Sequence, residues 1–350
     1  MSTRDEIIAL FNGQKLKNIP LFSGLISVSE PGLEREGLRF HETHQDAARM
    51  ARAAASTYRV SGFGSAVVPL DLCVEAEALG ATVDFRQGSE GAEFPRVAGF
   101  LYENVEKFTT ETTENTEKIK KDSVGSVISV VDRGRIPIVI EAIRLLKVDV
   151  GREIAIGAWV PGPFTLLSLL VETGALYMSM RRSVERFHGA LYFLTQILSA
   201  VGNAYHEAGA DFLTIHEMGG SPGALGPKLF ESIVLPHLQA LTSALPGPVV
   251  LSACGRTNGT MKLLATSGAD ALSIDQTNNL AASRAEVSDM LLLGNLDPVG
   301  LISQGTPSQI TEAVAGVVRS GADAVWPGCD LYPQTPLENL RALVDASKSK

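Results

Sequence analysis

The chain has 350 residues, of which 45% are hydrophobic and 20% are charged, and its formal net charge is −9. This composition excludes a disordered chain, and the acidic balance argues against nucleic acid or anionic membranes as main partners. The opening residues carry early charges in an amphipathic pattern, and no apolar run is long enough to cross a bilayer. With only three cysteines and no signal peptide pattern, the sequence predicts a cytoplasmic protein without a disulfide framework.

Eight strands are expected along the chain, and from residue 154 onward each is followed by an amphipathic helical pattern. They read IPLFSGL (19–25), GSAVVPLDL (64–72), IAIGAWVPGP (154–163), ADFLTIHEMGG (210–220), PVVLSACG (248–255), ADALSIDQ (269–276), MLLLGNLDP (290–298) and ADAVWPGCD (322–330). Their near-continuous hydrophobicity is typical of a parallel sheet that is buried on both faces.

This alternation of strands and helices predicts a single-domain (β/α)8 TIM barrel over residues 1–350. An N-terminal extension precedes the barrel, and an excursion of roughly 80 residues separates strands 2 and 3. The excursion contains the charged stretch 103–122, which is expected to be solvated. A doubly wound open sheet is the alternative, although no glycine-rich dinucleotide fingerprint supports it.

In a TIM barrel the active site lies at the carboxyl ends of the strands. In this sequence those ends carry small or polar residues, namely Asp71 and Cys73, Pro161 and Gly162, His216 and Glu217, Ser252 and Cys254, Asp275 and Gln276, Asn295 and Asp297, and Cys329 and Asp330. A barrel built for stability alone would not require small or polar residues at the ends of so many consecutive strands. The pattern therefore indicates an enzyme.

The three cysteines are expected to differ in role. Cys254 and Cys329 come directly before loops, and two thiolates at a barrel mouth suit a borderline ion such as zinc. Cys73 precedes a helical pattern and is expected to be a small buried residue.

Two further strand ends leave alternatives open. His216 and Glu217 are neighbours on one strand, so only one of the two side chains points into the barrel. Asp297 is expected either to line the mouth or to cap the helix that begins at Pro298.

Several segments resemble the uroporphyrinogen decarboxylase superfamily, and the resemblance extends over essentially the whole chain. They include GPFTLLSLLVE (162–172), GPKLFESIVLPHLQAL (226–241), GNLDPVGLISQGTPSQI (294–310) and WPGCDLYPQTPLENLRALV (326–344). Within the superfamily the sequence is most similar to the corrinoid-dependent methyltransferases of the methylcobalamin:coenzyme M type. Residues 23–33 lack the arginine pattern that would hold the carboxylates of a porphyrinogen, which disfavours porphyrinogen decarboxylation.

The resemblance implies a zinc site made by a His-x-Cys, an acidic residue at the next strand and a later cysteine. Zinc there lowers the pKa of a thiol that attacks the methyl group of methylcobalamin on a partner corrinoid protein. The matching cysteines are Cys254 and Cys329. However, Ser252 stands at the position of the histidine, and Gln276 stands where glutamate is usual.

Three interpretations accommodate these departures. Zinc is kept with a replacement ligand, which is Glu217, His216 or Asp275. Alternatively, the metal is lost and methyl moves to or from a non-thiol such as a pterin, with acidic residues handling protons. In the third interpretation the chain is a non-catalytic binding module. A metal-independent decarboxylase of a carboxylated substrate is the alternative enzyme.

We expect a methyltransferase that moves a methyl group between a cobalamin-carrying partner protein and a small acceptor or donor, with zinc. The predicted residues are Glu217, Asp275 and Asp71 for catalysis, His216, Gln276, Asn295, Asp297 and Ser252 for substrate binding, and Cys254, Cys329 and Glu217 for the metal.

Overall fold

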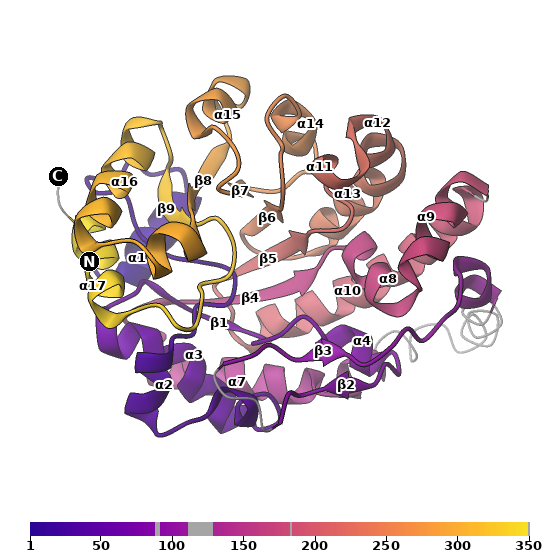
Figure 1. Ribbon diagram of the computed structural model, residues 1–350, viewed down its shortest axis with the longest axis horizontal. Helices are drawn as coiled ribbons and strands as arrows, with labels where there is room; N and C mark the ends of the chain where they lie inside the picture. The colour runs from indigo at the N-terminus through magenta and orange to yellow at the C-terminus, as the bar shows by residue number, and fades with distance from the viewer. Residues whose placement is uncertain (88–91, 111–128, 183, 349–350) are drawn as a thin grey trace.

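The computed structural model describes residues 1–87, 92–110, 129–182 and 184–348. Its centre is a curled parallel sheet in the order β1-β4-β5-β6-β7-β8-β9, with helices around it (Figure 1). The strands are β1 (Ser65–Val68), β4 (Ala155–Pro161), β5 (Phe212–Glu217), β6 (Val249–Ala253), β7 (Ala271–Ile274), β8 (Leu291–Leu296) and β9 (Ala324–Pro327). Two short strands, β2 (Val83–Asp84) and β3 (Arg96–Val97), form a separate antiparallel pair.

Helices follow the barrel strands in the expected alternation. The α-helices are α1 (Thr3–Phe11), α2 (Glu30–Glu36), α3 (Ala47–Ser61), α4 (Val74–Ala78), α7 (Ile136–Asp149), α8 (Pro163–Leu170), α9 (Thr173–Arg182), α10 (Val184–Ala208), α11 (Pro222–Leu225), α12 (Pro227–Leu229), α13 (Leu235–Ala244), α14 (Met261–Ala265), α15 (Leu280–Glu286), α16 (Pro307–Arg319) and α17 (Leu337–Lys348). Short 3-10 or π turns are η1 (Phe40–Glu42), η2 (Ser129–Asp132), η3 (Phe230–Val234) and η4 (Pro298–Ser303). No helix in the described part of the chain has the length and apolar character needed to cross a membrane.

Local sequence explains where several of these helices begin. Ser2 and Thr306 each form a capping box, in which the hydroxyl and the third helical residue satisfy free N–H groups at the start of α1 and α16. Proline occupies the first turn of α8 and α16, where a missing N–H has no cost.

The first of the eight barrel positions in chain order is occupied by the segment 20–25, which is less regular than the predicted strand. It meets β9 through a parallel bridge between Leu21 and Val325. The N–H of Val325 donates to the carbonyl of Pro20 at 2.9 Å. Because Pro20 itself has no N–H, the ladder cannot extend past it. The predicted strand 19–25 is thus reduced to a bridge.

On its other side the same segment is joined to β1 through a side chain. The Ser65 hydroxyl accepts from the N–H of Ser23 at 2.9 Å and donates to the carbonyl of Ser23 at 2.7 Å. Gly24 lies so close to β5 that a Cβ there would be 2.1 Å from the Thr214 hydroxyl oxygen. The seven strands and this segment together make the predicted (β/α)8 barrel.

The inside of the barrel is filled in layers. The layer at the beginnings of the strands is apolar and includes Phe22, Phe212 and Trp326, and it packs against Ile7 and Leu10 of α1. Helix α1 therefore covers the end of the barrel opposite the carboxyl ends of the strands, leaving the polar layers at the other end, the barrel mouth.

The predicted excursion lies between β1 and β4, which are the predicted strands 2 and 3. Its described part contains α4, the β2–β3 pair, η2 and α7. Most of the charged stretch 103–122, for which a solvated surface was predicted, lies outside the described residues.

Candidate functional site

Three side chains with nitrogen and sulfur ligand atoms meet at the barrel mouth. His216 lies on β5, Cys254 follows β6 and Cys329 follows β9. Their ligand atoms all lie within 4.8 Å of one another, and Cys254 Sγ is 3.8 Å from His216 Nε2. We call these three residues the thiol–imidazole group.

Strand alternation explains why His216, and not Glu217, joins this group. Successive residues of a strand point to opposite faces. On β5 Phe212 belongs to the inner layer and Leu213 and Ile215 to the outer core, so His216 faces inward. This answers which of the two neighbouring residues enters the barrel.

The register between β5 and β6 explains how an imidazole reaches the cysteines. His216 is the Cα partner of Ser252 in the parallel ladder. The imidazole therefore comes from the adjacent strand, at the same height as the serine that occupies the position expected for histidine. Cys254 lies two residues beyond Ser252, on the same side of β6.

The imidazole of His216 is held on several sides. The residue is 2% exposed, its Nδ1 lies 3.3 Å from the Ser252 hydroxyl oxygen, and its ring meets that of Trp159 edge to face at 5.9 Å. Burial lowers the pKa of His216, but the hydrogen bond and charge of Cys329 outweigh it and raise the pKa above its usual value.

Cys254 and burial both oppose the ionisation of Cys329. The hydrogen bond with Cys254 and burial both raise the pKa of Cys329 well above that of a free thiol, and the charge of Asp330 adds to this. A divalent cation between the sulfurs would reverse this effect, because metal coordination deprotonates a thiol outright.

The donor atoms fit zinc. Zinc binds thiolate at about 2.3 Å and imidazole at about 2.0 Å, so tetrahedral angles place the two donor atoms roughly 3.6 Å apart. The observed distance from Cys254 Sγ to His216 Nε2 is 3.8 Å. A set of one imidazole and two thiols is also one that zinc prefers.

Glu217, predicted both as a catalytic residue and as a metal ligand, lies outside the thiol–imidazole group. Its Oε1 accepts from the Thr165 hydroxyl at 2.5 Å and from the N–H of Gly220 at 2.9 Å. Its Oε2 packs against Gly162, where a Cβ would lie 2.1 Å away. Burial raises the pKa of this fully buried carboxyl. The placement on the outer face of β5 corrects the expectation that Glu217 reaches the metal.

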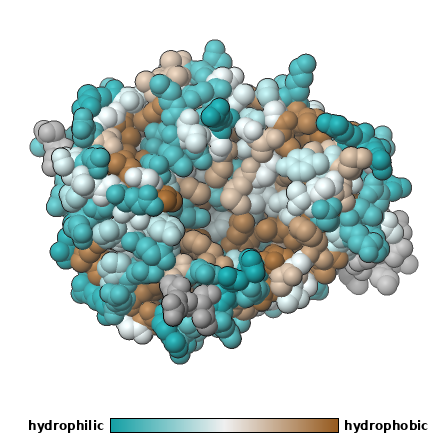
Figure 2. Space-filling model, in the orientation of Figure 1, coloured by the Kyte–Doolittle hydropathy of each residue, from teal (hydrophilic) through white to brown (hydrophobic). Residues whose placement is uncertain are grey.

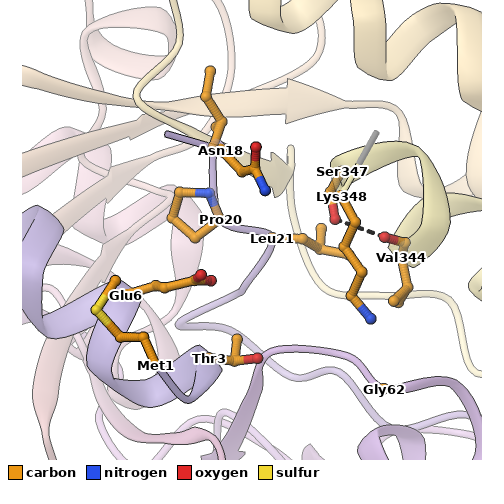
Figure 3. A pocket seen from close by; sticks show the side chains of 11 residues that line it. Met1, Thr3, Glu6, Asn18, Pro20, Leu21, Gly62, Val344, Ser347 and Lys348 are labelled. Atoms are coloured by element: carbon orange, nitrogen blue, oxygen red, sulfur yellow. Dashed lines mark hydrogen bonds between the residues drawn. The ribbon is translucent and has the colours of Figure 1, made fainter. Parts of the chain in front are cut away.

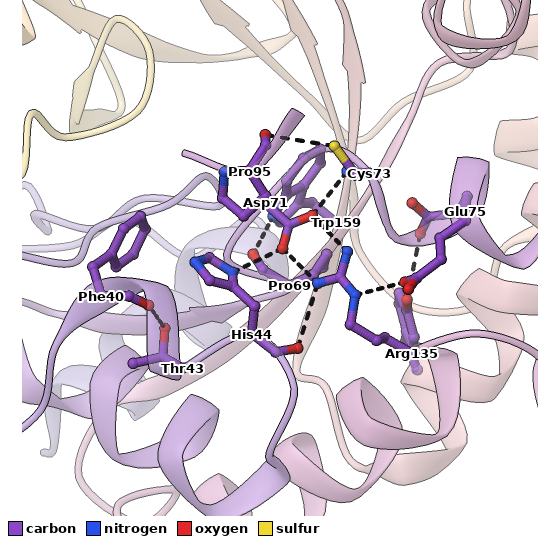
Figure 4. Close-up of polar contacts among 12 residues, drawn as sticks. Phe40, Thr43, His44, Pro69, Asp71, Cys73, Glu75, Pro95, Arg135 and Trp159 are labelled. Atoms are coloured by element: carbon purple, nitrogen blue, oxygen red, sulfur yellow. Dashed lines mark hydrogen bonds and ion pairs between the residues drawn. The ribbon is translucent and has the colours of Figure 1, made fainter. Parts of the chain in front are cut away.

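Asp71, predicted as a proton-transfer residue, is held in a buried ion network (Figure 4). Its Oδ2 lies 2.8 Å from His44 Nδ1, and Arg135 donates to both carboxylate oxygens at 2.6 and 3.0 Å. Arg135 also donates to Glu77 Oε2 at 2.6 Å. We call His44, Asp71, Glu77 and Arg135 the carboxylate–guanidinium network.

The surroundings of Asp71 argue against a role in proton transfer. Burial alone would raise its pKa, but the hydrogen bonds and charges of His44 and Arg135 hold the pKa well below its usual value. The N–H of Cys73 is a further donor to Oδ1, at 2.9 Å. With 0% exposure and every lone pair directed at a donor, Asp71 anchors the loop after β1. Neither His44 nor Arg135 was predicted from the sequence as a partner of Asp71.

A second buried carboxyl adjoins this network. Glu75 is 0% exposed and accepts from the Tyr205 hydroxyl at 3.3 Å through Oε1, while its Oε2 has no hydrogen-bond partner. Burial raises the pKa of Glu75 to about 8. Cys73, predicted to be a buried small residue, is 2% exposed, and burial raises its pKa to about 12.

Asp275 and Asn295 tie the mouth loops together. Asp275 accepts from the N–H of Thr277 at 2.7 Å and from that of Gly255 at 3.3 Å, next to Cys254. Asn295 donates to the carbonyls of Asp275 and Asn278 at 3.1 and 2.9 Å. Asp275 therefore holds the loop that carries Cys254, and Asn295 holds the loop that carries Asp275.

Gln276, Asn295 and Asp297, all predicted to bind substrate, line a pocket of about 370 Å³ between α15, η4 and α16. Asp297 is the N-cap of η4 and accepts from the N–H groups of Val299 and Gly300, which favours the second of its two predicted roles. Gln276 packs against Gly328, where a Cβ would lie 2.6 Å from Oε1. It thus touches the turn that carries Cys329.

Another pocket, of about 250 Å³, lies beside α1 and α17, away from the mouth (Figure 3). Thr3, Glu6 and Lys348 are among the residues that line it.

In the space-filling view the rim of the molecule is hydrophilic, and apolar side chains gather toward the middle of the face (Figure 2).

Comparison with known proteins identifies the family. A model of the uroporphyrinogen decarboxylase (URO-D) family matches residues 2–349. The chain belongs to this family.

Among curated relatives of this URO-D family member are two Methanosarcina enzymes. "Methylcobamide:CoM methyltransferase MtbA" of Methanosarcina acetivorans is 29% identical over 91% of this chain and 89% of the relative. "Methylcobamide:CoM methyltransferase MtaA" of Methanosarcina barkeri is 27% identical over 98% of this chain and 96% of the relative. A solved structure described as "methyltransferase from Methanosarcina mazei" superposes with a TM-score of 0.88 at 25% identity, covering 99% of this chain and 98% of that chain. The predicted family, barrel and methyltransferase activity are confirmed.

Proposed function

We propose that this protein transfers a methyl group between a cobalamin-carrying partner protein and a small thiol, at a zinc ion held by His216, Cys254 and Cys329. The convergence of one imidazole and two thiols within 4.8 Å at the barrel mouth is the observation that carries this proposal. The names of the relatives, which specify methylcobamide and CoM, support the choice of donor and acceptor.

The chain's own residues supply the ligands and their geometry. His216 offers Nε2, and Cys254 and Cys329 offer thiolates, which leaves one position of a tetrahedral site for a substrate. Bound zinc would keep a thiol substrate ionised at neutral pH, because coordination lowers the pKa of the thiol.

The mouth loops are fixed before any ligand arrives. Asp275 bonds the backbone next to Cys254, and Asp330, next to Cys329, accepts from the N–H of Ile26 at 3.0 Å. Trp159 packs on the imidazole and is itself fixed by a 2.8 Å bond to the carbonyl of Pro69. Such second contacts hold a binding constellation within the narrow tolerance that function needs.

Metal content and methyl transfer of matched variants test the proposal. The purified wild type is expected to hold about one zinc per chain and to move methyl from methylcobalamin to a thiol. Cys254→Ala, Cys329→Ala and His216→Ala should lose zinc and, with it, activity by at least roughly a hundred-fold. Cys73→Ala is the matched control, because Cys73 is an equally free thiol that lies outside the thiol–imidazole group.

Three results would contradict the proposal. A wild type without zinc that still methylates a pterin supports the metal-free methyltransferase instead. If Cys254→Ala and Cys329→Ala retain both zinc and activity, the metal lies elsewhere. Release of carbon dioxide from a carboxylated substrate without corrinoid would favour the decarboxylase.

A further inference from the structure

We infer that Ser252 is a positioning residue whose hydroxyl oxygen accepts from Nδ1–H of His216, so that the Nε2 lone pair is free to face the two thiols. The inference rests on the proposed function in that it takes the thiol–imidazole group as a metal site. It concerns a serine that stands where the related methyltransferases are expected to have a metal-binding histidine. In this chain the serine serves the histidine of the neighbouring strand.

The two ring nitrogens of His216 face different partners. His216 Nε2 lies 3.8 Å from Cys254 Sγ, whereas Nδ1 lies 3.3 Å from Ser252 Oγ. A neutral imidazole carries one proton, so Nε2 can bind a metal only if that proton is on Nδ1. The Nδ1–H then needs an acceptor.

The contact between His216 Nδ1 and Ser252 is buried. His216 and Ser252 are each 2% exposed, so bulk water does not readily replace the serine. A buried donor without an acceptor costs about 1–3 kcal/mol. Without the Ser252 hydroxyl, the ring avoids this cost by moving its proton to Nε2 or by rotating, and either change spoils Nε2 as a ligand.

Two hydroxyls near Ser252 make no contact of this kind. Thr214 and Ser273 lie on the flanking strands β5 and β7, and Ser273 is the register partner of Ser252. Both of these hydroxyls are buried and have no hydrogen-bond partner, whereas that of Ser252 faces His216 Nδ1. Among these three, only Ser252 is placed to act on the imidazole.

The variants follow from this comparison. Ser252→Ala removes the acceptor, and Ser252→Thr restores it on the same Cβ. Ser273→Ala is the matched control, because it deletes a buried, unpartnered hydroxyl at the same height in the adjacent strand. Circular dichroism and thermal unfolding establish that each variant is folded.

Two readouts are used on the full chain. The zinc-free, reduced protein is labelled with ¹⁵N in its six histidines, and long-range proton–nitrogen correlation, recorded at a pH where His216 is neutral, shows which of its ring nitrogens is protonated. The His216→Asn variant identifies the signal. Competition with a chromophoric chelator then gives the affinity of each variant for zinc.

We expect Nδ1–H in the wild type and in the Ser252→Thr and Ser273→Ala variants. Ser252→Ala should lose this fixed tautomer and bind zinc roughly ten- to a hundred-fold more weakly, the usual effect of removing a partner of a metal-binding histidine. A proton on Nε2 in the wild type, or a Ser252→Ala variant unchanged in both tautomer and affinity, overturns the inference.

The two proposals can fail separately. If the wild type does not bind zinc, the proposed metal site is wrong, and the tautomer in the zinc-free protein still decides the role of Ser252. If the wild type binds zinc and the Ser252→Ala variant matches it in both readouts, only the role of Ser252 is wrong.

Discussion

The thiol–imidazole group and the carboxylate–guanidinium network both lie after barrel strands, yet they differ in what their polar atoms face. In the network, Asp71 is bonded by Arg135, His44 and the backbone of Cys73, and it has no exposure. In the thiol–imidazole group, the ligand atoms face one another, and burial and contact work against the ionisation of Cys329.

The difference separates a structural anchor from the proposed metal site. Buried charges that are fully paired stabilise one local structure and have no capacity left for a ligand. Donor atoms that converge and are held together only by weak thiol hydrogen bonds have capacity left for an added cation. Position at a strand end, the criterion available from sequence, does not distinguish the two cases.

The largest expected effect tests the anchor. Asp71→Ala leaves the Arg135 guanidinium buried and without its main partner, which should cost about 3–5 kcal/mol in the free energy of unfolding, measured with urea. Asp275→Ala is the comparison at the mouth, because Asp275 accepts only backbone N–H groups among the contacts described, and a smaller loss of about 1 kcal/mol is expected. Equal losses for the two variants would remove the distinction.

The next effect depends on pH and concerns Glu75 beside the network. Its pKa is about 8 in the folded protein and near its usual value when unfolded, so its contribution to stability is fully present below about pH 4.5 and is lost as pH rises toward 8. Glu75→Gln removes this titration and keeps the acceptor for Tyr205. The variant should gain stability over wild type by on the order of 3 kcal/mol between pH 5 and pH 8.

A control for that result lies two residues further along the same helix. Glu77→Gln weakens the contact with Arg135 instead of relieving a buried charge, so no gain at pH 8 is expected. Urea midpoints at the two pH values measure both variants. A wild type whose stability relative to Glu75→Gln does not change with pH would show that Glu75 is not buried as described.

Glu217 offers a sharper version of the comparison, because it is adjacent to His216 in sequence. Glu217→Ala leaves the Thr165 hydroxyl and the N–H of Gly220 without their acceptor, and a loss of about 2 kcal/mol in unfolding free energy is expected. The zinc content should stay at the wild-type value. If the Glu217→Ala variant is folded and has nevertheless lost zinc, Glu217 is one of the metal ligands.

The smallest effect on stability is expected for Cys329→Ala in the zinc-free protein. The substitution removes a thiol whose ionisation is already opposed, so the unfolding free energy should change by about 1 kcal/mol or less. In the presence of zinc, only the wild type should gain stability, because a ligand that binds the folded state alone shifts the equilibrium. Thermal unfolding with and without zinc checks this, and an equal zinc response in the variant would contradict it.

The barrel and the two cysteines could be predicted from the sequence because both depend on local pattern. Apolar strands that end in loops indicate a parallel barrel, and Cys254 and Cys329 stand at two such ends. Alternation alone also established that only one of His216 and Glu217 enters the barrel. Which of the two enters depends on which set of alternate residues of β5 faces the barrel interior, and the sequence alone does not determine this.

The partners of Asp71 could not be predicted for a different reason. His44 and Arg135 lie 27 and 64 residues away in the chain, on a turn and at the start of a helix in the excursion. Contacts of this kind depend on how separate segments pack. The alignment of His216 with Ser252 likewise depends on strand register, which a single sequence leaves open.

The position of segment 20–25 in the barrel affects the order in which the chain folds. It pairs with β9, the last barrel strand in the chain, and the loop after β9 is bonded to Ile26 at Asp330 and Leu331. During synthesis, His216 and Cys254 are therefore made well before Cys329. The barrel cannot close until β9 is made and pairs with segment 20–25. At the proposed zinc site, metal loading by all three ligands would therefore be a late event that accompanies closure of the barrel, because only two of the three residues are available before β9 is made.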